Sequence, residues 1–169
     1  MKLPFNVGQK WVQIAVAVVV ALLVAALATR CAEAAEPVAQ FSYGRTVLRG
    51  ETDVLELAVR YPDAGPGDAD YAFGVTFIGP SSLYDVPQPA NFAWRAEIID
   101  GFGRFDVGLG LAVMQNEDIY NSGRMNFTLS LGYRFKRWPV AVTLRHFSNG
   151  STKRPNKGRD LLTIGWIFQ

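Results

Sequence analysis

Eight short segments in which apolar residues alternate with small or polar ones follow one another along the chain, and this pattern constrains the fold most strongly. Successive side chains of a β-strand point to opposite faces, so a period of two gives each segment one apolar face. Gly, Pro, Asn and Asp separate the segments, as turns require. The alternation predicts strands over residues 39–47, 54–61, 71–78, 91–100, 105–115, 125–135, 139–148 and 160–168.

The second face of these segments decides between a soluble barrel and a membrane barrel. A soluble barrel needs an outer surface rich in Lys, Asp and Glu, but the second face consists mostly of Gly, Ala, Ser and Thr. Its few charges have both signs and suit the filled interior of a narrow barrel. They are Glu56, Arg60, Arg95, Glu97, Asp106, Arg134 and Arg145. The sequence therefore predicts an all-β fold, an eight-stranded antiparallel transmembrane β-barrel with its apolar face toward lipid.

The first 34 residues are predicted to be an N-terminal signal peptide that is cleaved from the barrel. Lys2 and Lys10 form a basic start, residues 14–28 form an unbroken apolar run, and Ala32-Glu33-Ala34 fits a cleavage site. The apolar run is shorter than the roughly 20 residues that a membrane-spanning helix needs. The barrel domain is expected to span residues 35–169, without the single cysteine of the chain and without a disulfide.

Composition limits the partners. Without the signal peptide, acidic and basic residues are equal in number, so nucleic acid is not an expected partner. One histidine and no cysteine in the mature chain cannot build a typical zinc site, and no metal or other cofactor is expected. Outer-membrane lipids are the expected surroundings, and the oligomeric state stays open, a homodimer included.

His146, Ser148 and Asp160 are the candidate catalytic residues. His146 is the only histidine and lies two residues before Ser148, so both side chains share one strand face, with Cβ atoms ~6–7 Å apart. Asp160 is the first residue of the last segment, and the alternation places its side chain on the same lipid-facing side. A serine nucleophile needs an adjacent base, and that base needs a third group to orient it. The simpler alternatives are an interfacial histidine, a turn-forming serine and a loop carboxylate.

The stretch from Arg145 to Asp160 resembles the lipid A 3-O-deacylases of the PagL type, which are outer-membrane esterases on eight-stranded barrels. The matching motifs are Arg145-His146-Phe147-Ser148-Asn149-Gly150, then Pro155-Asn156-Lys157-Gly158, then Asp160. The resemblance implies that His146 is the general base, Ser148 the nucleophile and Asp160 the acid that orients the base. It also implies that Asn149 helps to stabilise the oxyanion. The acid of the family is typically Glu, so Asp160 is one methylene shorter.

Lys153, Arg154, Lys157 and Arg159 form a basic run beside the candidate site. In an arbitrary barrel this run is a solvated loop, but beside an esterase site these cations could hold lipid A phosphates. The first hypothesis is a serine esterase of the bacterial outer membrane that removes the ester-linked 3-O acyl chain from lipid A of lipopolysaccharide. The alternative is a non-catalytic small outer-membrane barrel of the structural or adhesion type.

Overall fold

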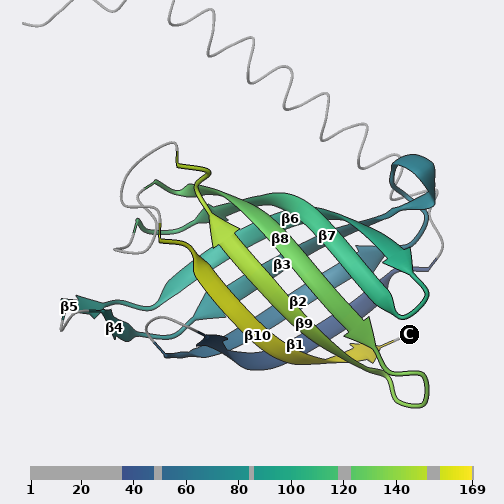
Figure 1. Cartoon of the computed structure of the whole chain (residues 1–169), viewed down its shortest axis with the longest axis horizontal. Helices are drawn as coiled ribbons and strands as arrows, with labels where there is room; N and C mark the ends of the chain where they lie inside the picture. Colours follow the sequence, from purple (N-terminus) through teal and green to yellow (C-terminus); the bar gives the residue numbers. More distant parts are fainter. Residues whose placement is uncertain (1–35, 48–50, 84–85, 118–122, 152–156, 169) are drawn as a thin grey trace, which may run out of the picture. The chain divides into compact units, whose positions relative to one another are not determined.

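The computed structural model of the chain describes residues 36–47, 51–83, 86–117, 123–151 and 157–168. Eight strands form a closed antiparallel barrel in the order β1-β10-β9-β8-β7-β6-β3-β2 (Figure 1). Their bounds are β1 (Val38–Val47), β2 (Asp53–Tyr61), β3 (Asp70–Ile78), β6 (Asn91–Phe102), β7 (Phe105–Met114), β8 (Met125–Arg134), β9 (Val140–Ser148) and β10 (Arg159–Phe168). The predicted fold class is confirmed, and each predicted strand agrees with its barrel strand to within two residues at either end.

The two faces of the strands separate as the alternation predicts. In β8, Phe127 and Leu131 are 54% and 50% exposed on the outside, whereas Thr128 between them is 2% exposed on the inside. Large apolar side chains are exposed in the same way on seven of the eight barrel strands, and on β3 the outward ones are half-buried. An outer surface of this kind is stable in lipid and would be costly in water. The barrel is therefore of the transmembrane type.

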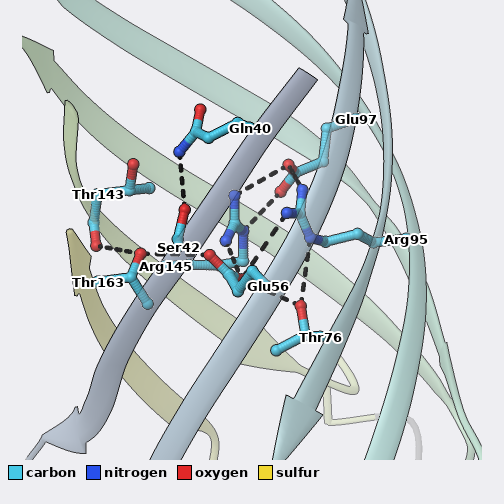
Figure 2. Close-up of polar contacts among 9 residues, drawn as sticks. All are labelled: Gln40, Ser42, Glu56, Thr76, Arg95, Glu97, Thr143, Arg145 and Thr163. Atoms are coloured by element: carbon cyan, nitrogen blue, oxygen red, sulfur yellow. Dashed lines mark hydrogen bonds and ion pairs between the residues drawn. The ribbon is translucent and has the colours of Figure 1, made fainter. Parts of the chain in front are cut away.

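A buried ionic cluster, the interior quartet, crosses the lumen (Figure 2). It consists of Glu56 on β2, Arg95 and Glu97 on β6, and Arg145 on β9. Arg145 donates from Nε to Glu97 Oε1 at 3.1 Å and also bonds to Glu56 through Nη1, while Arg95 Nη1 donates to Glu97 Oε2 at 2.7 Å. Buried charges are tolerated when they are paired in this way. The quartet ties β9 to β2 and β6 from inside the barrel.

The other charges of the inner face form a second cluster. Arg60 donates to both carboxylate oxygens of Asp106 at 3.1 and 3.2 Å and also bonds to Asp70. Arg134 Nε lies 3.0 Å from the same Asp106 carboxylate. All seven charges that the sequence assigned to the interior are thus held in ion pairs.

The two ends of the barrel differ. The turn end carries the connections 102–105 and 134–140 together with the start of β1 and the end of β10, whose residues Ala39 and Phe168 pair. The last residues of β7 and β9 and the first residues of β8 and β10 lie at the opposite end, called here the loop end. Figure 1 shows the C-terminal side of β10 at one end, and the short strands β4 (Ser81–Leu83) and β5 (Val86–Gln88) at the other.

Strands β4 and β5 lie within residues 79–90, a stretch for which the alternation predicted no strand. The two strands pair with each other through Ser81–Gln88 and Leu83–Val86. Pro87 lies inside this pairing, opposite Ser82, which an isolated two-stranded ladder tolerates because its edges need no further partner. At the turn end, the β2–β3 connection contains a short 3-10 turn, η1 (Pro66–Asp68).

The predicted signal peptide, residues 1–34, lies outside the described residues. In the ranges that are described, no helix is long and apolar enough to cross a membrane.

Candidate functional site

His146 and Asp160 face each other across neighbouring strands. They are paired residues in the β9–β10 ladder, and imidazole Nδ1 is 2.8 Å from carboxylate Oδ1. The two side chains are 42% and 25% exposed, so they are open to the outer surface of the barrel. When the Nδ1 proton is donated to the carboxylate, Nε2 is the imidazole nitrogen that can accept a proton. This is the arrangement that a general base requires.

Ser148 ends β9 on the same face as His146, two residues further along the strand. It pairs with Phe127 of β8, and its Oγ accepts the backbone N–H of Gly150 at 3.2 Å. Gly150 has φ +62°, and a β-carbon there would lie 2.8 Å from the Phe127 ring. Glycine therefore lets the chain turn over Phe127 immediately after the serine.

Asn149 does not share the exposed face of His146 and Ser148. Its side chain is 1% exposed, and its Oδ1 accepts the backbone N–H of Ser151 at 2.9 Å, which stabilises the turn. The amide group that can donate hydrogen bonds is Nδ2. If Asn149 stabilises the oxyanion, its Nδ2 must donate the hydrogen bond, and this side chain is buried just after the end of β9.

Gly158 is a site residue to which the sequence assigned no role beyond its place in the motif. It has φ +68°, and a β-carbon at this position would lie 2.5 Å from His146 Cε1 and 3.1 Å from Nε2. The imidazole thus packs against a position that only glycine fills without strain. A glycine just before a predicted strand indicates a turn, but the contact with His146 depends on the folded ladder.

The structure places the residues of the basic run in different environments. Arg159 is 2% exposed and pairs with Phe147, which is also buried, so Arg159 lies on the inner face of β10 and not in the loop to which the basic run was assigned. The reason is the strand period, because β10 begins at Arg159 and the residue before the outward Asp160 must face inward. Lys157 is partly exposed before the start of β10. Lys153 and Arg154 lie outside the described residues.

The surroundings of the His146–Asp160 pair are apolar. Leu129 of β8 is the other ladder partner of His146 and is 51% exposed. Leu144 and Leu162 are exposed two pairs further along the β9–β10 ladder. Within the described part of the chain, no group of three or more His, Cys, Asp or Glu side chains is placed to hold a metal ion. The site is a small polar patch on a lipid-facing wall.

Comparison with known proteins supports the resemblance found in the sequence. Residues 92–168 match the sequence model of the family described as lipid A 3-O-deacylase (PagL). The chain is also similar to a protein solved as the crystal structure of the outer membrane enzyme PagL, with 18% identity, a TM-score of 0.48, and coverage of 78% of this chain and 99% of that chain. No curated protein sequence matches this chain at a significant level.

The family match confirms the resemblance over a stretch that begins in β6 and contains every candidate site residue. The match stops short of the first three barrel strands, β1 to β3. The closed barrel and its apolar outer surface agree with a location in an outer membrane.

Proposed function

We propose that this chain, which matches the lipid A 3-O-deacylase family over residues 92–168, is a serine esterase that removes the 3-O-linked acyl chain of lipid A. The observation that carries the proposal is the contact between His146 Nδ1 and Asp160 Oδ1 on the lipid-facing wall, on the same face as Ser148. Polar groups at such positions are costly unless they are used.

In the proposed reaction Ser148 Oγ attacks the carbonyl carbon of the acyl ester while His146 Nε2 takes the hydroxyl proton. The carbon–oxygen bond to the sugar then breaks, and the proton passes from His146 to the leaving sugar oxygen. Water then attacks the acyl-serine while His146 takes a proton from it, the bond to Ser148 Oγ breaks, and His146 returns the proton to Ser148 Oγ as the fatty acid leaves. Asp160 orients the imidazole throughout. Asn149 Nδ2 is the proposed donor to the oxyanion.

The position of the site supports a lipid as the substrate. His146 and Ser148 lie near the loop end of β9, on the outside of the barrel, where an acyl ester at the membrane interface can reach them. No passage through the lumen is required, because the substrate approaches from the membrane plane. We assign Lys157, with Lys153 and Arg154 of the same loop, to the phosphates of lipid A.

The test is mass spectrometry of lipid A incubated with the purified, refolded barrel in mixed micelles. We expect loss of one acyl chain from the 3-O position with the wild-type protein and no loss with Ser148→Ala or His146→Ala. Ser151→Ala is the matched control, because Ser151 is an exposed serine of the same turn. Retained heat-dependent gel mobility shows that each variant is folded.

Three results would contradict the proposal. Wild-type release by Ser148→Ala would exclude the nucleophile, and loss of a chain from another position would exclude the 3-O assignment. No release by the folded wild-type protein under any of these conditions would favour the non-catalytic barrel.

A further inference from the structure

Two neighbouring turns at the turn end, far along the strands from the candidate site, carry three exposed cations. Arg104 lies between β6 and β7, and Lys136 and Arg137 lie between β8 and β9. The turns are adjacent because β7 pairs with β8, and the backbone N–H of Arg134 donates to Arg104 O at 2.8 Å. We call Arg104, Lys136 and Arg137 the turn-end cations.

None of the turn-end cations forms an ion pair with a described residue. Arg104 Nη1 donates to the hydroxyl of Tyr133 at 3.3 Å, which holds its side chain along the rim without neutralising it. The nearest inward carboxylate, Asp106, is already bound by Arg60 and Arg134. The exposed carboxylates of this end are Glu36, Asp63, Asp68 and Asp100, and none of them is ion-paired with a turn-end cation. The positive charge of the two turns is thus not neutralised by a described carboxylate.

A ladder of aromatic rings borders the turn-end cations on the outside. Phe105 and Tyr133 have ring centroids 5.2 Å apart, Tyr133 and Phe135 also 5.2 Å, and Phe135 and Trp138 6.2 Å. Trp138 is 67% exposed. Aromatic belts of membrane barrels lie at the level of the lipid headgroups. The ladder therefore places the cations at the height of lipid phosphates.

The same cations line one cavity. A space of about 980 Å³ at the turn end is bordered by Arg104, Lys136 and Arg137, and by Trp138 of the aromatic ladder. Its deeper wall includes the Arg60–Asp106 cluster. The three cations therefore border the same cavity, at which a single anion can approach them.

We propose that Arg104, Lys136 and Arg137 bind the phosphate of an anionic glycerophospholipid in the leaflet at the turn end. Guanidinium and ammonium groups bind phosphate through charge-assisted hydrogen bonds. A lipid fits better than a free phosphate, because the aromatic ladder provides a surface for its glycerol and acyl portions. With the usual barrel polarity this is the periplasmic leaflet. The binding is independent of the proposed esterase activity.

Native mass spectrometry of the full barrel tests this proposal, using micelles that contain phosphatidylglycerol or phosphatidylcholine with identical acyl chains. We expect the wild-type protein to retain phosphatidylglycerol preferentially. In Arg104→Gln/Arg137→Gln the apparent affinity for phosphatidylglycerol should fall about fivefold for each cation removed. The matched control is Arg45→Gln/Arg124→Gln, which removes two exposed arginines at the loop end and should leave this preference unchanged.

Equal retention of the two lipids by the wild-type protein, or equal losses in both double variants, would overturn the proposal. Displacement of phosphatidylglycerol by millimolar inorganic phosphate would instead identify a free-anion site and exclude the lipid. If the double variant does not fold, Lys136→Gln and Arg137→Gln are measured singly, since both are exposed turn residues, and unchanged lipid preference in both would also overturn it.

Discussion

Asp160 lies directly opposite His146 in the β9–β10 ladder, and this register is why a short acid reaches the imidazole. Directly paired residues have Cβ atoms ~4.5–5.5 Å apart, a gap that an aspartate can span. The contact of 2.8 Å between Oδ1 and Nδ1 therefore needs no longer side chain. The departure from the Glu that is typical of the family does not remove the contact.

Asp160→Asn should lower kcat by roughly 100-fold or more, because the amide orients the imidazole poorly and does not stabilise its charged form. Asp160→Glu should retain most of the activity, since a carboxylate still faces His146. Lipid A deacylation by the folded variants measures both effects. Full activity in Asp160→Asn would show that another group, or none, orients the base.

Gly158→Ala should abolish most of the activity while leaving a folded barrel. Its new methyl group would overlap His146 Cε1, so the imidazole must move away from its position beside Asp160. Gly103→Ala is the matched control, because Gly103 also has positive φ, +67°, but has open space around its Cβ position. Both changes should cost about 1–2 kcal/mol of backbone strain. Equal activity in the two variants would exclude a positioning role for Gly158.

Lys157→Gln should raise KM for phosphorylated lipid A and leave turnover of a neutral short-chain ester nearly unchanged. The expected split arises because Lys157 would bind a remote part of the substrate while the triad performs the chemistry. Steady-state kinetics on both substrates decide it. Parallel losses on the two substrates would mean that Lys157 supports the structure of the site instead.

Arg145→Ala should destabilise the barrel by about 3–5 kcal/mol, because it leaves the buried carboxylates Glu56 and Glu97 short of their partner. Arg45→Ala, which removes an exposed pair with Glu51, should cost less than about 1 kcal/mol. Equilibrium unfolding in urea with refolding into micelles compares the two. A small loss for Arg145→Ala would show that the remaining quartet neutralises itself.

Leu109→Arg tests the lipid-facing surface. Leu109 is exposed in the middle of β7, where an arginine should cost about 2–4 kcal/mol. Met125→Arg, at the loop-end start of β8, should cost at most about 1 kcal/mol, because the membrane interface accepts charge. Equal and small costs at both positions, measured by unfolding from bilayers, would contradict a membrane-spanning β7.

The strands and their faces could be predicted because each is a local property of the sequence, with the alternation of Phe127, Thr128 and Leu131 enough to orient β8. Contacts between residues far apart in the sequence could not be predicted in this way. The sequence shows that Arg145 and Glu56 face inward, but their ion pair joins residues 89 apart and depends on the closed barrel. Strands β4 and β5 were missed because the prolines of residues 79–90 indicate a loop.

The candidate site shows the same division. The alternation of side chains along a strand placed His146, Ser148 and Asp160 on one face. The same alternation places Arg159 on the inner face, but the basic run was assigned to a loop. The burial of Asn149 and the contact between Gly158 and His146 arise from the turns at the strand ends. Turn geometry of this kind follows from the register and not from composition.

The outward position of His146 has a consequence for how such a catalyst meets its substrate. An active surface on the outer wall samples molecules that diffuse in two dimensions, so encounter frequency depends on the mole fraction of substrate in the membrane and not on its bulk concentration. Diluting lipid A with inert detergent at constant total lipid A would then slow hydrolysis, as expected for surface-dilution kinetics.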